Sequence, residues 1–329
     1  MLRRTRERRA LLARLREFDR LVLLGDVVEL RHGPTRDALA AAAPVLRELG
    51  AAVGEVVVVP GNHDHGLLRG WLERRDPTPL GLESAVEWDR REALGSLVES
   101  LPAARVRVAY PGVWLRDDVY ATHGHYGDRH NTVPILERLG AGLTVRVAGE
   151  PAGGPTRAED YEAALAPMYA WADTLAQSGG LRLGGGGSFQ IGAWQALNGG
   201  AGGRSLRSRA MALGLAAAVT GLNRAGMGPL RPDVSGVALR RGALSAFTEV
   251  LARLDVPAGA HVIFGHTHRA GPLPGDDGSE WRRLLNVGTW VYEARLMGDD
   301  PASSPYRPGF AAIVGDDGPP ELVNLLDRA

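Results

Sequence analysis

The amino-acid sequence predicts an α/β fold that carries an inserted, mostly helical segment. Two observations lead to this prediction. Between residues 129 and 245, Gly and Ala become frequent and several stretches have helical character. Outside that segment, short apolar runs each end in a turn that contains His, Asp or Asn; these runs are Leu21–Leu24, Val56–Val59, Val113–Tyr120 and His261–Phe264. Loops at the carboxyl ends of strands form the active sites of open α/β sheets, so we expect these turns to meet.

Helices are expected before and between the strands. Residues 2–18 are dense in Leu, Ala, Arg and Glu and lack Gly and Pro, which indicates a helix, and residues 36–49 indicate a second one. The segments expected to be helical farther along are 158–177, 205–224 and 240–254, the last returning to the main body. We therefore place the domain boundaries as 1–127 and 246–329 for the core and 128–245 for the helical cap.

Composition excludes several classes of function. Lys+Arg and Asp+Glu are equal at 38 each, which argues against a nucleic-acid or anionic-membrane binder. There is no cysteine, so disulfides, thiolate zinc sites and cysteine nucleophiles are excluded. Every basic residue apart from His is Arg, which together with abundant Ala and Gly indicates GC-rich coding and a bacterial source. The longest uncharged stretch that is also mainly apolar, Ala210–Leu222, is shorter than the roughly 20 residues of a membrane span. Since the N-terminus lacks an apolar segment, we expect a cytoplasmic protein.

Histidines gather at the predicted strand ends. Of nine histidines, six form three close pairs: His63 with His65, His123 with His125, and His266 with His268. Neutral imidazole is the commonest metal ligand in proteins, and Asp26 and Asn62 add oxygen donors beside it. The pattern therefore predicts a metal site built from nitrogen and oxygen ligands.

Four ordered motifs carry a family resemblance. They are Gly25-Asp26-Val27-Val28-Glu29, Gly61-Asn62-His63-Asp64, His123-Gly124 and Gly265-His266-Thr267-His268. In order and in placement at strand ends, they resemble the calcineurin-like metallophosphoesterases. The resemblance covers roughly residues 1–127 and 246–329, and the cap lies outside it. It implies a four-layer α/β/β/α sandwich with a dinuclear metal centre at the strand ends.

The resemblance also implies a ligand set. Asp26 would bridge two metal ions, and Mn²⁺, Fe²⁺/³⁺, Zn²⁺ and Ni²⁺ all accept such nitrogen and oxygen ligands. Asn62, His123 and His266 would complete the shell of one ion, and His268 would bind the other. A pair of ions held by a bridging carboxylate can activate water and stabilise both apical oxygens of an in-line displacement.

Two further residues would do proton chemistry. By the resemblance, His63 would contact the phosphate and protonate the leaving oxygen, because imidazole has a tunable pKa near neutrality, and Glu29 would hold its ring. His65, His125 and Arg269 are candidates for contact with the substrate. Alternatively, these three residues only flank the metal ligands or have a structural role. Asn286 and His261 are expected to be structural.

One motif of the family is missing. A strand ending in Asp-x-His supplies the remaining ligands of one ion, but only 24 residues precede Gly25 and they contain no His. Either the sequence begins late, which we favour, or the protein is a one-metal or non-catalytic relative.

The function expected from these observations is a hydrolase: a metal-dependent phosphoesterase that cleaves a phosphomonoester, phosphodiester or pyrophosphate. Its substrate would be small and phosphorylated, a nucleotide or a lipid-linked phosphate. The apolar stretch Met211–Leu222 could line a pocket for a lipid, although we favour core packing within the cap as its explanation. The alternative is a non-catalytic protein that binds a phosphorylated ligand or regulates a partner.

Overall fold

The computed structural model describes residues 5–76, 78–132, 136–177, 214, 217–233, 236–298 and 300–327. The chain forms two compact units, the first made of Met1–His125 and Pro257–Ala329 and the second of Tyr126–Val256. Most of the predicted helix 205–224, and much of the stretch Met211–Leu222, lies outside the described residues, but 217–224 are helical.

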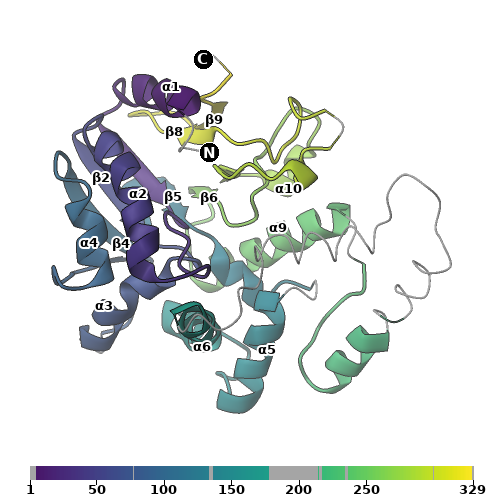
Figure 1. Ribbon diagram of the computed structural model, residues 1–329. Helices are drawn as coiled ribbons and strands as arrows, with labels where there is room; N and C mark the ends of the chain where they lie inside the picture. The colour runs from purple at the N-terminus through teal and green to yellow at the C-terminus, as the bar shows by residue number, and fades with distance from the viewer. Residues whose placement is uncertain are drawn as a thin grey trace. The chain divides into compact units, whose positions relative to one another are not determined.

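One sheet dominates the first unit (Figure 1). Among the described residues it has seven strands, in the order β1-β2-β4-β5-β6-β7 with β3 paired to β4. The strands are β1 (Arg20–Leu24), β2 (Glu55–Val59), β3 (Glu83–Ala85), β4 (Arg105–Arg116), β5 (Val119–Thr122), β6 (His261–Phe264) and β7 (Leu284–Asn286). The pairs β1–β2, β2–β4, β5–β6 and β6–β7 are parallel, and β3–β4 and β4–β5 are antiparallel. This mostly parallel sheet confirms the predicted α/β class.

The strand predicted at Val113–Tyr120 is wrong in its extent. The chain turns at Asp117 and Asp118, and these residues separate β4 from β5, which pair with each other as an antiparallel hairpin. The apolar and β-branched residues on both sides hid the turn, although Asp is common in turns because its side chain bonds to nearby backbone.

Strand β4 brings the two halves of the sheet to a common point. The carboxyl-terminal end of β2 lies opposite Val108, since Val58 pairs with it. The carboxyl-terminal end of β5 lies opposite Gly112, since Thr122 pairs with that residue. Although β2 and β5 run in opposite directions, both therefore end beside the middle of β4. The loops that follow them emerge at the same place.

The core fills the inner face of the curled sheet. It is built from alternate residues of five strands: Val57, Val59, Ala109, Val113, Val119, Ala121, Ile263 and Leu285. Ala312 and Leu322 pack against this core from a second, two-stranded sheet formed by β8 (Phe310–Ile313) and β9 (Glu321–Asn324). β-Branched residues dominate because they pack well on a pleated surface.

Helices α2 and α4 lie side by side over strands of the first unit (Figure 1). The helices of this unit are α1 (Thr5–Leu15), α2 (Thr35–Gly50), α3 (Arg69–Arg74), α4 (Ala93–Glu99) and α10 (Gly278–Trp281), with short 3-10 turns at His65–Leu68 and Ala294–Leu296. The helices predicted over 2–18 and 36–49 are confirmed as α1 and α2, with 1–4 outside the described residues.

The second unit is helical in its described part. Its helices include α5 (Leu136–Ala148), α6 (Ala158–Gln177) and α9 (Gly236–Arg253), after a 3-10 turn at His125–Arg129. The predicted helices 158–177 and 240–254 are confirmed as α6 and α9. Helix α9 belongs to this unit, so a boundary at 245 would divide it.

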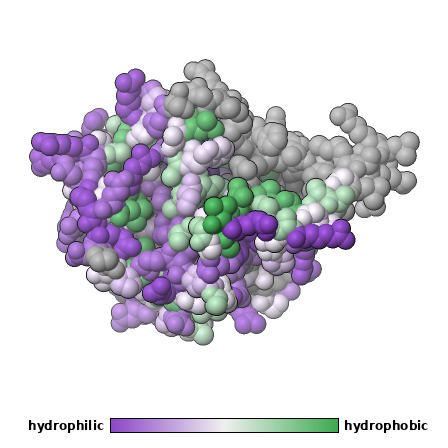
Figure 2. Space-filling view, turned by 90° about the horizontal axis from the view of Figure 1, so that it is seen from below, coloured by the Kyte–Doolittle hydropathy of each residue, from purple (hydrophilic) through white to green (hydrophobic). Residues whose placement is uncertain are grey.

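The surface of the molecule is mixed. Figure 2 shows polar residues around a patch of apolar ones on one face. Large apolar side chains that are exposed on the second unit include Leu143, Val147 and Trp171. No described helix is long and apolar enough to cross a bilayer.

Candidate metal centre

His123 stands at the centre of the candidate site, directly after β5. Its Nδ1 lies 3.1 Å from the backbone carbonyl oxygen of Leu24, which can only accept a hydrogen bond, so Nδ1 carries a proton. Its Nε2 lies 3.1 Å from Oδ1 of Asn62 and 3.3 Å from Oδ2 of Asp26. A neutral ring would point a lone pair at these two oxygens. The arrangement therefore suits a positive charge between them, either a proton or a metal ion.

The distances from His123 Nε2 match those within a metal shell. Ligand atoms that bind one ion at about 2.1 Å lie roughly 3.0–3.4 Å from one another. The distances from Nε2 to the amide oxygen of Asn62 and to the carboxylate oxygen of Asp26 both fall in that range. The contact from His123 Nδ1 to Leu24 is also the kind of outer contact that orients a metal-binding imidazole. A divalent ion fits this donor set.

Asp26 is held in its charged form. Burial alone would raise the pKa of Asp26, but the neighbouring His123 and His63 outweigh burial and bring the pKa well below its ordinary value. The backbone N–H of His63 also donates to Oδ1 of Asp26 at 2.9 Å. A carboxylate that stays ionised in a buried place is suited to binding a cation.

Backbone strain is concentrated in the same residues. Asp26, His266 and His268 have φ values of 51°, 63° and 61°, in the left-handed region that non-glycine residues rarely occupy. Each such residue costs on the order of 1–3 kcal/mol and persists only where its surroundings enforce it. Three residues predicted as metal ligands therefore share an unfavourable backbone conformation, which is typical of functional sites.

Two glycines let the loops approach this closely. Gly25 has a φ of +80°, and a Cβ there would overlap the ring of His123. A Cβ on Gly61 would lie 2.5 Å from Oδ1 of Asp26 and 2.8 Å from the ring of His123. The Gly-Asp and Gly-Asn pairs of the motifs are thus required for the contact between the β1, β2 and β5 ends.

The remaining predicted ligands lie beside His123. The rings of His123 and His266 are 5.2 Å apart between centroids, at an interplanar angle of 72°. His268 lies within electrostatic reach of Asp26, and burial lowers its pKa to about 4, so it is neutral and its nitrogens can bind a metal. In the described residues, however, no three His, Asp or Glu side chains stand close enough to hold an ion as they lie. The imidazoles of His266 and His268 would have to turn to close the shell.

The predicted acid and its partner are in contact. Nδ1 of His63 lies 2.6 Å from Oε2 of Glu29. Burial lowers the pKa of His63, but the hydrogen bond to Glu29 and the charge of Asp26 outweigh it, so the pKa is raised. Burial alone would raise the pKa of Glu29. The hydrogen bond to His63 and the charges of His63 and His32 outweigh burial, so the pKa of Glu29 is lowered.

Sequence reasoning missed Arg31 as a site residue. Its Nη2 donates to the backbone oxygen of Asn62 at 2.9 Å, and its Nη1 lies 3.4 Å from Nε2 of His63. The guanidinium is therefore fixed beside the predicted acid. A lone Arg two residues after Glu29 gives no signal of this in a chain with so many arginines.

Asp64 was also given no role. It is completely buried and accepts the backbone N–H groups of Gly61 at 2.6 Å and Val27 at 2.7 Å. It thereby ties the turn after β2 to the turn after β1. Burial and the charge of Asp26 raise the pKa of Asp64 to about 6. Its position within the second motif was the available signal.

The three substrate-contact candidates lie in different surroundings. His125 is buried, with Nε2 3.1 Å from Tyr110 Oη, and His65 packs edge-on against the same tyrosine. Both imidazoles thus form a layer of rings that includes Tyr110. Arg269 makes two contacts with Asp276, at 2.6 and 3.0 Å. Phosphate contact by Arg269 stays a prediction and would have to compete with this ion pair.

Asn286 forms hydrogen bonds to the turn at Gly265–His268, as expected for a structural residue. Its Nδ2 donates to the backbone oxygen of Gly265 at 3.1 Å and to Oγ1 of Thr267 at 2.8 Å. The strained turn that carries His266 and His268 is therefore fixed to β7. His261 lies in β6 and contacts Arg283 at 3.3 Å.

Comparison with known proteins adds no family assignment. No protein-family model matches this sequence, and no curated protein matches it either.

Proposed function

We propose that this chain is a metal-dependent phosphoesterase of the calcineurin-like type. The observation that supports it most is the environment of His123, whose Nε2 faces one carboxylate and one amide oxygen at 3.1–3.3 Å while Nδ1 is fixed by Leu24. Asp26, Asn62 and His123 would hold one divalent ion, with His266 turning toward it, and Asp26 with His268 would contact a second. Bound ions would supply a Lewis acid and lower the pKa of a water molecule.

The remaining residues would bind and protonate the substrate. His63, oriented by Glu29, would donate a proton to the leaving oxygen of a phosphate ester, and its raised pKa keeps that proton available near neutral pH. Arg31 lies beside His63 and would attract a phosphate oxygen. Acid, guanidinium and carboxylate thus lie within one group of turns.

The fold is compatible with this proposal. The family implied by the motifs has two facing sheets with outer helices, and here the β8–β9 sheet packs on the inner face of the large sheet. We include the four-layer sandwich, the small phosphorylated substrate and the cytoplasmic location in the proposal.

The test is hydrolysis of phenyl phosphate and diphenyl phosphate, whose phenoxide leaving group needs a proton, by protein supplied with Mn²⁺. We expect turnover that is abolished by EDTA and reduced at least about 100-fold in His63→Gln, because general acids contribute roughly 10²–10⁴-fold. His261→Gln is the matched control, since His261 is the first residue of β6, whereas the candidate site lies after the last residue of that strand. Equal activity in the two variants would contradict the role of His63.

A binding protein without turnover is the second candidate. The second ion has only Asp26 and His268 as proposed ligands, and a centre with so few donors could hold a phosphate without cleaving it. Metal-dependent phosphate binding with no hydrolysis of either ester would select this candidate.

A further inference from the structure

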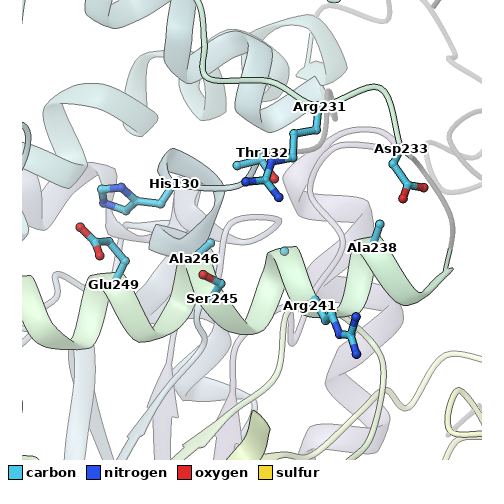
Figure 3. Close-up of a pocket in the computed structure, with 10 residues that line it drawn as sticks. His130, Thr132, Arg231, Asp233, Ala238, Arg241, Ser245, Ala246 and Glu249 are labelled. Atoms are coloured by element: carbon cyan, nitrogen blue, oxygen red, sulfur yellow. The ribbon is translucent and has the colours of Figure 1, made fainter. Parts of the chain in front are cut away.

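The second unit contains a pocket of about 610 Å³ (Figure 3). This volume lies in the range of small-molecule sites. Its lining residues come from three segments of the chain: His130 and Thr132, then Arg231 and Asp233, and then Ala238, Arg241, Gly242, Ser245, Ala246 and Glu249 of α9. All of these described lining residues belong to residues 126–256, which form the second unit.

Helix α9 presents two adjacent rows of side chains to this pocket. Residues four apart lie on one face of a helix. One row consists of Ala238, Gly242 and Ala246, and the other of Arg241, Ser245 and Glu249. The small row leaves space above the helix, and the polar row supplies hydrogen-bonding groups along it.

Two loops opposite α9 are held rigidly by Arg138. This side chain is 1% exposed, and it donates from Nε to the backbone oxygen of Asn131 and from Nη2 to that of Gly228, both at 2.9 Å. It thus joins the segment before Thr132 to the loop before Arg231. The backbone N–H of Arg231 then donates to the backbone oxygen of Thr132 at 2.7 Å.

Asn223 fixes the second loop further. Its side chain exchanges two hydrogen bonds with the backbone of Leu230, at 2.8 and 3.0 Å, and Leu230 is itself buried. The backbone at Arg231 is therefore preorganised, which lowers the entropic cost of binding a ligand there.

The guanidinium of Arg231 carries the uncompensated charge. Within the part of the chain that the structure describes, it has no hydrogen-bond or ion-pair partner, and neither do the hydroxyls of Thr132 and Ser245. Figure 3 shows Arg231 reaching from its loop toward Thr132. Glu249 is paired with Arg253 at 2.7 Å, and neither Asp233 nor Arg241 is free.

We propose that this pocket binds a small hydroxylated organic anion, whose phosphate or carboxylate group contacts Arg231 and the hydroxyls of Thr132 and Ser245. The body of the ligand lies over the small row of α9, and its hydroxyl groups donate to Glu249 at the end where His130 also lies. A guanidinium with free donors forms paired hydrogen bonds with either oxyanion. This proposal does not rest on the phosphoesterase function.

The test uses full-length protein treated with EDTA and carrying Asp26→Asn, so that the metal centre cannot supply an anion site. Isothermal titration calorimetry is run with glucose 6-phosphate, glucuronate and, as the uncharged probe, glucose. Arg231→Gln is compared with Arg224→Gln, a matched control at an exposed position outside the pocket. Thermal unfolding of both variants checks that the fold is kept.

We expect at least one of the two anions to bind, glucose to bind far more weakly, and Arg231→Gln to weaken anion binding at least about tenfold while Arg224→Gln leaves it unchanged. Preference for glucose 6-phosphate or for glucuronate identifies the oxyanion. The proposal is overturned if neither anion binds, if glucose binds equally well, or if both variants bind like the parent. None of these results depends on hydrolysis.

Discussion

Oε2 of Glu29 lies 2.6 Å from Nδ1 of His63, and the two residues come from different turns, one after β1 and one after β2. Burial opposes both shifts, but the partner together with Asp26 raises the pKa of His63, and the partner together with His32 lowers the pKa of Glu29. The pair therefore favours a charged imidazolium beside a charged carboxylate. That is the protonation state an acid needs before it transfers a proton.

Replacement of Glu29 by Gln should lower the pKa of His63, because a neutral amide stabilises the imidazolium less than a carboxylate does. An NMR titration of the histidine ring protons measures this pKa. Glu99→Gln, at an exposed site on α4, is the control and should leave it unchanged. A pKa of His63 that stays the same or rises in Glu29→Gln would refute the electrostatic role of the pair.

The same pair predicts how stability depends on pH. The pKa of His63 is raised above 6.5, so its contribution is complete below pH 6.5 and is lost as pH rises through the native pKa. The pKa of Glu29 is lowered below 4.5, so its contribution is lost as pH falls through the native pKa. The free energy of unfolding of the parent protein should exceed that of Glu29→Gln by the largest amount at pH values between the native pKa of Glu29 and that of His63. Urea unfolding at a series of pH values measures this difference.

Gly25→Ala should unfold or distort the site, because the added methyl group overlaps the ring of His123 and the backbone is left-handed at a φ of +80°. We expect a loss of about 2–4 kcal/mol in the free energy of unfolding. Gly33→Ala is the matched control, since a Cβ there meets nothing within 4 Å. Equal losses in the two variants, measured in urea, would argue against close contact between the turn after β1 and His123.

Asp64→Asn should destabilise the protein by about 1–3 kcal/mol. The two carboxylate oxygens of Asp64 accept two backbone N–H groups, whereas Asn offers one oxygen and leaves one of these donors facing an NH₂ group. Asp37→Asn on the exposed side of α2 should have little effect. The urea midpoints of the two variants provide the comparison, and a stable Asp64→Asn protein would show that the link between the turns is dispensable.

His130 should make the second unit sensitive to acid. Burial and the charges of Arg129 and Arg253 lower its pKa to about 4. Since the unfolded chain takes up this proton near pH 6.5, the stability of the parent protein should fall as pH drops from 6.5 to 4. His130→Gln lacks this titration, so its stability relative to the parent should rise over that interval in urea unfolding. A constant difference between the two proteins would contradict a half-buried, neutral His130.

Helices and strands with a clear pattern of apolar residues could be predicted from the sequence. The Val-rich run at Val56–Val59 was predicted as a strand, and the structure shows it as part of β2 with all four side chains buried, which explains why the run does not alternate. Helix α6 was predicted with the same limits as those observed. The hairpin at Asp117 and Asp118 was missed, because two acidic residues between apolar ones also suit an exposed strand edge.

The site was predictable as a set of residues but not as a geometry. Strand-end motifs pointed to Asp26, Asn62 and His123, which the structure brings together. The pairing of β2 and β5 with β4, which places the ends of both strands beside the middle of β4, joins segments far apart in the sequence, and no local pattern encodes it. The role of Arg31 depends on that same pairing, since its partners Asn62 and His63 follow a different strand.

We propose that Asp26, Asn62 and His123 bind a divalent ion, and the metal stoichiometry of the protein tests this most directly. The protein is loaded with Mn²⁺, desalted and analysed by elemental mass spectrometry beside Asp26→Ala, with Asp37→Ala as the control. We predict at least one tightly held ion per chain in the parent and in Asp37→Ala, and none in Asp26→Ala. A parent protein that retains no metal, or an Asp26→Ala protein that retains as much as the parent, would contradict the metal centre.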